Sequence, residues 1–359
     1  MQPKRLRLRK TNKKKELFVQ KRSFAFLLFL LIAAVAMLIS YTVFDNQRVL
    51  IHRVEVSIPT MPRSLNGYSI LPISDLHGKT FEAQQAGILR AIGAAHYDMI
   101  LFLGDMSDND KQDPAPFYQL IDTLSAMKKP MYYTQGNHDP SLWDLSGGHC
   151  KPTPYLQGML DRGVQLLDRP VKLKETEEGS LWLWPADRML SDAQAAVETA
   201  ENNIEFARMR NVPEGDAEAE YNEYLLEQYM AILQAREEIL PDDVHIAASH
   251  YPITPARYEL ISQYTGEEIT LKDAELMIAG HYHAGQMRIP YFGAFYVHDN
   301  DLPRAGWFPE QSKIAGLSKQ GDLRQYICRG LGASGPLPVR FRLFNTPEIA
   351  LLKLTSSVE

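Results

Sequence analysis

The sequence predicts an α/β fold that follows an N-terminal membrane-spanning helix, and three observations support this prediction. Five short apolar runs of strand length end at glycine or at polar residues, as buried strands do. Amphipathic stretches with helical periodicity lie between several of these runs. An uncharged apolar run near the N-terminus has about the length that a helix needs to cross a bilayer.

The N-terminal region is predicted to form three segments. Residues 1–23 form a basic cytoplasmic tail with ten Lys or Arg residues and one acid, Glu16. Residues 24–44 form a transmembrane anchor, and residues 45–57 form a linker. Because the basic residues precede the anchor, the positive-inside rule places the tail in the cytoplasm. The expected location is therefore the cell membrane, with a single pass and an extracytoplasmic domain.

Two alternatives to an uncleaved anchor stay open. Residues 34–36, Ala-Val-Ala, resemble the cleavage site of a signal peptide, although the apolar run continues to Ile39 and so favours an anchor. Residues 21–24, Lys-Arg-Ser-Phe, are weakly similar to a twin-arginine export signal.

Charge is distributed unevenly along the chain. The whole sequence carries −6, and residues 1–23 carry +9, which leaves −15 on the other residues. The basic tail suits anionic lipids at the cytoplasmic face of a membrane. The acidic remainder argues against nonspecific binding to nucleic acid, which depends on neutralisation of phosphates by basic residues. We therefore expect a membrane but no nucleic acid among the partners, and the oligomeric state is left open.

Residues 58–359 are predicted to form one large domain, because no repeat, low-complexity tract or second linker interrupts them. Residues 81–95 and 116–128 supply amphipathic helices that would cover a sheet. The two cysteines, Cys150 and Cys328, exclude a disulfide-rich scaffold and a thiolate metal site, and their pairing stays open. The predicted strands cover residues 68–74, 99–103, 131–134, 244–249 and 276–279.

Two segments of the domain lie outside the strand pattern. Residues 191–242 are predicted to form a helical insert that is broken near residues 211–215. Its second helix, residues 217–240, carries apolar residues at helical spacing and many acids, so we interpret it as a core-packing helix with a solvated acidic face. A lid over a binding cleft is the alternative. Residues 288–324 are rich in Pro and Gly and are predicted to form an irregular loop.

Polar motifs follow the five predicted strands. Because ligands in open α/β sheets bind beyond the carboxyl ends of strands, we expect these motifs to meet in one place. Carboxylate and amide oxygens mixed with imidazoles, without thiolates, suit Mn, Fe, Zn or similar divalent ions and indicate a hydrolytic site. The motifs are Asp75-Leu76-His77, Gly104-Asp105, Gly136-Asn137-His138-Asp139, Ser249-His250 and Gly280-His281-Tyr282-His283.

The order of these motifs resembles that of the calcineurin-like metallophosphoesterase family. The resemblance covers most of the chain after residue 50, and residues 285–286, 329–332 and 344–349 are similar to the membrane-anchored or exported bacterial branch of the family. The sequence departs from the family pattern at Tyr282, where a small polar residue is usual, and at Ala284, where glycine is usual. The resemblance implies a layered α/β/β/α sandwich of two mixed β-sheets, with the metal ligands in loops at one edge.

The resemblance also implies a role for each motif residue. Two divalent metal ions, Mn, Fe or Zn, are expected as cofactors. Asp105 would bridge them, since a carboxylate can serve two cations at once. His138 would protonate the leaving group, and Asp139 would orient His138 or support the loop. The first ion would be held by Asp75, His77 and His283, and the second by Asn137, His250 and His281.

The expected activity is hydrolysis of a phosphate ester or pyrophosphate by attack of metal-bound hydroxide. The substrate would be a phosphorylated small molecule or lipid, including lipid-linked or envelope-linked compounds. The alternative is a membrane-anchored binding or adaptor protein that uses the acidic helical insert. Asp108 would orient a ligand or cap a helix, and Arg329 and Arg340 are expected to be surface or structural residues.

Overall fold

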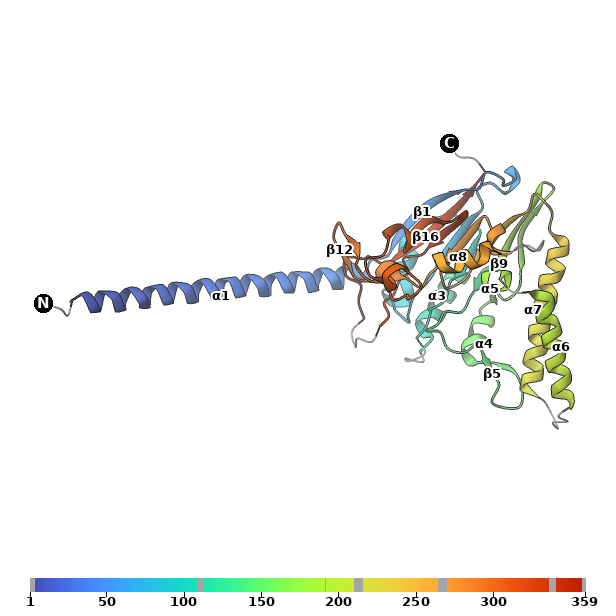
Figure 1. Cartoon of the computed structure of the whole chain (residues 1–359), viewed down its shortest axis with the longest axis horizontal. Coiled ribbons are helices and arrows are strands. Elements are labelled where there is room, and N and C mark those ends of the chain that lie inside the picture. The colour runs from blue at the N-terminus through green and yellow to red at the C-terminus, as the bar shows by residue number, and fades with distance from the viewer. Residues whose placement is uncertain are drawn as a thin grey trace. The chain divides into compact units, whose positions relative to one another are not determined.

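The structure is a computed structural model that describes residues 4–108, 113–190, 192–209, 216–263, 270–335 and 340–356. The chain forms two units, Met1–Asp45 and Asn46–Glu359. The first unit consists of helix α1 (Lys4–Gln47), which continues for two residues into the second (Figure 1). Its section Lys21–Gln47 is long and apolar enough to serve as a membrane anchor or as a signal sequence.

Two six-stranded mixed sheets form the centre of the second unit (Figure 1). Adjacent strands in these sheets are mostly parallel. The antiparallel pairs are β16 with β2, β14 with β15, and β8 with β9. The first sheet has the order β1 (Leu50–Ser57), β16 (Glu348–Thr355), β2 (Ser69–Ile73), β3 (Met99–Phe102), β4 (Met131–Tyr133), β7 (Val164–Leu166). The second has the order β14 (Gly316–Gln320), β15 (Leu323–Ile327), β11 (Leu276–Ala279), β10 (Val244–Ala248), β9 (Gly179–Pro185), β8 (Val171–Thr176).

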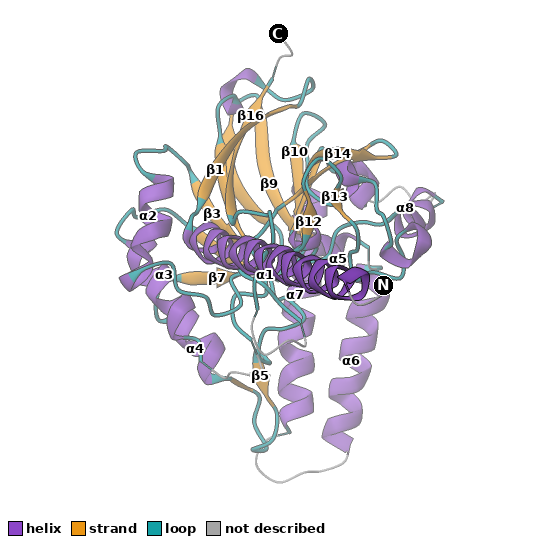
Figure 2. Ribbon diagram, turned by 90° about the vertical axis from the view of Figure 1, so that its left-hand side faces the viewer, coloured by secondary structure: helices purple, strands orange, loops and turns teal. Residues whose placement is uncertain are grey.

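Helices cover the outer faces of both sheets. Figure 2 shows α2, α3 and α4 on one side of the strands and α6, α7 and α8 on the other. The helices are α2 (Ala86–Ile92), α3 (Ala115–Ser125), α4 (Pro154–Leu160), α5 (Ala186–Met189), α6 (Ala193–Met209), α7 (Ala217–Glu238) and α8 (Pro255–Ser262). Short strand pairs are formed by β5 (Trp143–Asp144) with β6 (Lys151–Pro152) and by β12 (Arg288–Ile289) with β13 (Gly293–Ala294).

The hydrophobic cores match these layers. One core lies between the sheets and joins Leu101 of β3 to Ile246 of β10. A second packs the outer face of the first sheet, including Phe102, against Phe117 of α3. A third packs Trp184 of β9 against the helices on the other side. Helices, sheet, sheet and helices therefore form four layers, which confirms the predicted α/β/β/α sandwich.

The predicted linker 45–57 differs from the structure, because Leu50–Ser57 forms strand β1. This strand pairs in parallel with β16 over its whole length, from Leu50 opposite Glu348 to Ser57 opposite Thr355. β1 lies at the edge of the sheet and is largely exposed, so it lacks the continuous apolar run by which the buried strands were predicted.

The segment 288–324 is also more regular than predicted, since it contains β12, β13 and β14. The predicted insert forms α6 and α7, and its predicted break at residues 211–215 lies outside the described residues. Ile232 and Ala235 of α7 belong to the core with Trp184, which matches the core-packing interpretation of this helix.

Candidate metal centre

The five motifs lie at the carboxyl ends of β2, β3, β4, β10 and β11, and direct contacts bring the two sheets together there. The backbone N–H of Asp75 donates to Gly104 O at 3.1 Å within the first sheet's loops. His250, after β10, donates from Nδ1 to Leu103 O at 2.7 Å, and His281 N donates to Asp75 Oδ1 at 3.0 Å. The expected meeting of the motifs at one edge is therefore present.

A first group of donors consists of Asp75, His77, Asp105 and His283, all buried, with donor atoms within 4.8 Å of one another. His77 Nε2 lies 3.2 Å from His283 Nε2 and 3.6 Å from Asp105 Oδ2. His283 Nε2 lies 3.5 Å from Asp75 Oδ1. Ligand atoms about 2.1 Å from one tetrahedral cation lie roughly 3.4 Å apart, so these spacings suit a shared cation.

A second group consists of Asp105, His250 and His281. His250 Nε2 lies 3.3 Å from Asp105 Oδ2 and 3.1 Å from His281 Nδ1. The same His250 atom lies 3.1 Å from Asn137 Oδ1, which adds the predicted amide ligand to this group. Asn137 is exposed and His281 is half-buried, so this side of the site is open to solvent.

Asp105 belongs to both groups through one atom, Oδ2. This oxygen and Oδ2 of Asp75 are buried, and no described group hydrogen-bonds to either of them. Buried carboxylate oxygens without partners are costly unless a cation or a proton satisfies them. The donor set and these two oxygens therefore fit divalent metal ions.

In His250 and His77, the ring nitrogen that faces away from the donor groups, Nδ1, lies within hydrogen-bond distance of an oxygen. His250 Nδ1 donates to Leu103 O, and His77 Nδ1 lies 2.9 Å from Asp108 Oδ1. A ring that donates from one nitrogen presents a lone pair on the other, which is the form that binds a cation. Asp108 therefore orients a predicted ligand, the first of the two roles expected for it.

The ionisable groups influence one another strongly at the site. Burial raises the pKa of Asp105, but the His250 and His77 imidazoles outweigh burial and hold this pKa below its ordinary value. Burial lowers the pKa of His250, but Asp105 outweighs burial and raises it to about 9. Burial lowers the pKa of His281 to about 4 and that of His283 to about 3. The Asp105 carboxylate and the His250 imidazole thus each favour the charged form of the other.

Several predicted ligands have a left-handed backbone, which is unusual outside glycine. The φ angles are 54° for Asp75, 49° for His77, 52° for Asp105, 72° for His281 and 50° for His283. Such conformations cost about 1–3 kcal/mol each and persist where surrounding contacts impose them. Hydrogen bonds such as His77 N to Asp105 O at 2.9 Å supply those contacts.

Comparison with known proteins decides the family. The model of the calcineurin-like phosphoesterase family matches residues 68–285, which include every predicted ligand. The chain belongs to the calcineurin-like phosphoesterase family. Among curated relatives it is similar to an uncharacterised metallophosphoesterase, YkuE, of Bacillus subtilis (strain 168), at 24% identity over 315 residues and 85% of each chain.

Asp139 of this phosphoesterase lies behind the donor cluster and supports its loops. Its carboxylate accepts from the backbone N–H of Asp105 at 2.7 Å, Ser107 at 2.9 Å and Gly136 at 2.9 Å. It also accepts from the hydroxyls of Tyr133 at 2.8 Å and Tyr155 at 2.9 Å. With both oxygens engaged in this way, Asp139 is a positioning residue, which corresponds to the second of the two roles expected for it, support of the loop.

Gly136 allows the close approach of the Asp105 loop. A Cβ atom at this position would lie 2.2 Å from both the backbone N and Oδ1 of Asp105. Only glycine leaves this space, so the Gly-Asn-His-Asp motif begins with glycine for a steric reason.

His138 lies at the open edge of the cluster. Its backbone N–H donates to Asp105 Oδ1 at 2.8 Å, which holds the loop in place. Its ring centroid lies 5.2 Å from that of His77, and its side chain is 41% exposed. His77, Asp108 and His138 form a further group of close donors, and Arg340 pairs with Asp108, which agrees with a structural role for that arginine.

Arg342 is a supporting residue that sequence reasoning missed. It is fully buried, and its guanidinium donates to the carbonyl oxygens of Asn345 at 2.9 Å, Gly332 at 2.8 Å, His283 at 3.1 Å and Arg329 at 2.7 Å. Asn345 Nδ2 donates to His283 O at 2.8 Å as well. The two side chains together hold the backbone of a predicted ligand. The available signal was a charged residue between two apolar ones, Phe341 and Leu343.

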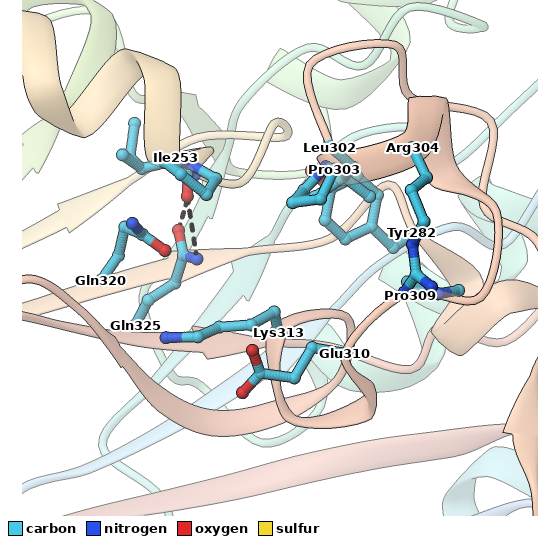
Figure 3. Close-up of a pocket in the computed structure, with 11 residues that line it drawn as sticks. Ile253, Tyr282, Leu302, Pro303, Arg304, Pro309, Glu310, Lys313, Gln320 and Gln325 are labelled. Carbon is cyan, nitrogen blue, oxygen red and sulfur yellow. Dashed lines mark hydrogen bonds between the residues drawn. The ribbon is translucent and has the colours of Figure 1, made fainter.

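A pocket of about 300 Å³ adjoins this site at Tyr282, the residue between His281 and His283. The Tyr282 and His281 ring centroids are 5.7 Å apart. Figure 3 shows Ile253 and Gln325 on one side of the pocket and Leu302, Pro303, Tyr282 and Arg304 on the other. The lining thus combines apolar side chains with polar ones, which also include Glu310, Lys313 and Gln320.

Proposed function

We propose that this phosphoesterase is a membrane-anchored hydrolase of phosphate esters or pyrophosphates that uses two divalent cations, Mn, Fe or Zn. The observation that carries the proposal is the position of Asp105 Oδ2, 3.6 Å from His77 Nε2 and 3.3 Å from His250 Nε2. One carboxylate oxygen is thus shared by two donor groups. When bound, a cation pair supplies Lewis acidity toward phosphate oxygens and an ionised water near neutral pH.

The residues of the chain have three further roles: they hold the cations, donate a proton and fix the positions of the loops. Asp75, His77 and His283 hold one cation, and Asn137, His250 and His281 hold the other, with Asp105 between them. His138 contributes no atom to these two groups, and its half-buried ring at the open edge can donate a proton to the departing oxygen. Asp139 keeps the loops of Asp105 and Gly136 together and so fixes the spacing of the donors.

The test uses bis-p-nitrophenyl phosphate and p-nitrophenyl phosphate as a phosphodiester and a phosphomonoester. We expect turnover that requires Mn²⁺, stops with chelator and is lost in Asp105→Asn. Asp242→Asn, the same change at an exposed carboxylate, is the matched control and should keep the parent rate. Turnover that survives both the chelator and Asp105→Asn would contradict the proposal.

The proposed location is the cell membrane, with residues 24–44 as the anchor and the second unit outside the cytoplasm. The apolar section of α1 and the ten basic residues before it support this orientation. Protease added to intact cells without an outer membrane should degrade the second unit and leave a short N-terminal fragment in the membrane. Recovery of a released chain that begins after residue 36 would instead establish a cleaved signal peptide.

The proposed substrate class is a phosphorylated small molecule or a lipid-linked phosphate. The apolar part of the pocket beside Tyr282, formed by Ile253 and Leu302 among others, supports a substrate whose leaving group has an apolar part. Leu302→Glu would place a further charge in this pocket, and we expect a higher KM for phosphoesters with an apolar leaving group while turnover of phosphoesters without an apolar part is retained. An equal KM of the parent and Leu302→Glu for a phosphoester with an apolar leaving group would remove the pocket from the proposal.

A further inference from the structure

Large apolar side chains are exposed along one stretch of the second unit. Phe292 is 81% exposed and Trp307 is 52% exposed, values that are high for such residues. Tyr291 and Phe292 form the turn between β12 and β13. We call the set the aromatic rim, and it consists of Ile289, Tyr291, Phe292, Trp307 and Phe308.

The two halves of the aromatic rim are joined by hydrogen bonds. Gln311 accepts from Ala294 N at 2.7 Å through Oε1 and donates to Ala294 O at 2.9 Å through Nε2. Phe308 N donates to Phe295 O at 2.8 Å, and the rings of Tyr296 and Trp307 lie 4.8 Å apart. The β12–β13 hairpin and the loop that carries Trp307 therefore form one ordered surface.

The aromatic rim lies near the point where the chain enters the second unit. Asn46, the first residue of that unit, donates to Arg342 O at 2.7 Å and accepts from Arg342 N at 2.8 Å. The next residue, Leu343, accepts from Arg288 N at 2.9 Å and donates to Gln286 O at 3.2 Å. Arg288, the first residue of the β12–β13 hairpin, is thus bonded to Leu343, the neighbour of the residue that Asn46 contacts.

The length of the backbone between the proposed anchor and Asn46 limits how far apart the two can lie. Asn46 follows residue 44, the last of the predicted membrane span, by two residues, a distance of at most about 7 Å. A span that ends at residue 44 therefore holds Asn46 close to the surface of the bilayer. Tyr and Trp side chains favour that depth, where an apolar ring meets lipid and a polar atom stays hydrated.

The charge of this stretch permits a membrane neighbour. Residues 286–316 contain Arg288, Arg304 and Lys313 and the acids Asp299, Asp301 and Glu310, so the stretch is neutral. Residues 24–359 as a whole carry −15. The aromatic rim is thus a neutral, apolar surface on an otherwise acidic body, and it can approach anionic headgroups without strong repulsion.

We propose that the aromatic rim docks on the lipid bilayer beside the anchor, with its rings at headgroup depth. The proposal rests on the proposed membrane anchoring and adds a second contact with the same membrane. The anchor selects a bilayer as the occupant because it brings that surface to Asn46 and hence to the hairpin. The docked surface would hold the catalytic unit in one orientation above the membrane.

The test uses the emission of Trp307 in the full chain, reconstituted in nanodiscs whose phosphatidylcholine is brominated on its acyl chains. The chain has four tryptophans, and Trp143, Trp182 and Trp184 are buried or half-buried. We expect bromolipid to quench a component of the parent's emission that is missing in Trp307→Phe. Phe292→Ser should reduce this quenching, whereas Leu260→Ser, a change of an exposed residue on α8, should not.

Each outcome separates the two proposals. Equal quenching of the parent and Trp307→Phe, in chains that elute with the nanodiscs, would overturn the docking and leave the anchoring intact. Failure of the chain to elute with the nanodiscs would overturn both. An unquenched Trp307 in discs that hold two chains by mass would assign the aromatic rim to a second copy instead.

Discussion

The edge of the sheets that carries the candidate metal centre and the α6–α7 hairpin are built in opposite ways. At the edge, short loops bury carboxylates and imidazoles, and single atoms such as Asp105 Oδ2 serve two neighbours. The hairpin buries mainly small residues, including Ala200 and Ala235, and its polar contacts with the body lie at half-buried positions such as Glu220. Function that depends on donor spacing is therefore concentrated at the edge, and the hairpin is free to change without disturbing it.

The largest expected effect that leaves the ligands in place comes from His138. His138→Ala should lower the rate of phosphoester hydrolysis by about 10²- to 10⁴-fold, the usual contribution of a general acid. Bound metal, measured by elemental analysis, should not change. His96→Ala, at an exposed histidine that pairs with Asp98, is the control. Loss of metal in His138→Ala would place His138 among the ligands and contradict the assignment.

A smaller effect is expected at Arg342, which touches no donor atom. Arg342→Lys cannot span the four carbonyl oxygens that the guanidinium reaches, so the backbone of His283 should loosen. We expect metal affinity, measured by titration, to fall by about 10- to 100-fold. Arg162→Lys removes a comparable bond to Gly158 O elsewhere and should leave affinity unchanged. A lower melting temperature with unaltered affinity would reduce Arg342 to a purely structural role.

In the α6–α7 hairpin, a substitution should lower the stability of the fold and leave the rate of hydrolysis unchanged. Tyr224 of α7 donates to Asp168 Oδ2 at 2.6 Å, and Tyr224→Phe should lower the free energy of unfolding by about 1 kcal/mol. Hydrolysis at saturating metal should stay at the parent rate. Tyr221→Phe, on the same helix and beside the same Trp143, is the control for the hydroxyl. A changed substrate preference in Tyr224→Phe would favour the lid interpretation of this segment.

The smallest expected effect concerns pH and lies away from both regions. Burial raises the pKa of Glu275 from 4.5 to about 7. Between these values the folded chain keeps a proton that the unfolded chain has lost, so this group's contribution to stability falls as pH rises. Glu275→Gln should therefore become more stable relative to the parent from pH 4.5 to 7, as measured by thermal unfolding. Glu259→Gln, at an exposed position on α8, should show no such trend.

The sequence predicted the layers and the donor residues because both depend on local patterns. Buried strands such as β11 are continuous apolar runs, and Asp75 or His281 follows such a run directly. β1 was missed because this exposed edge strand carries His52, Arg53 and Glu55 and so has no continuous apolar run. The role of Arg342 could not be foreseen, and the two roles expected for Asp139 could not be told apart, since both depend on contacts between residues far apart in the chain.

The hydrogen bonds between Asn46 and Arg342 connect the first residue of the second unit to the edge that carries the candidate ligands. Asn46 holds the backbone of the residue whose guanidinium holds His283, so securing one end restrains the other. Linkage of this kind is reciprocal: if restraint of Asn46 makes the free energy of cation binding more favourable, cation binding stabilises the restrained position of Asn46 by the same free energy. A chain loaded with metal should thus resist proteolysis between residues 46 and 50 longer than the same chain stripped by chelator.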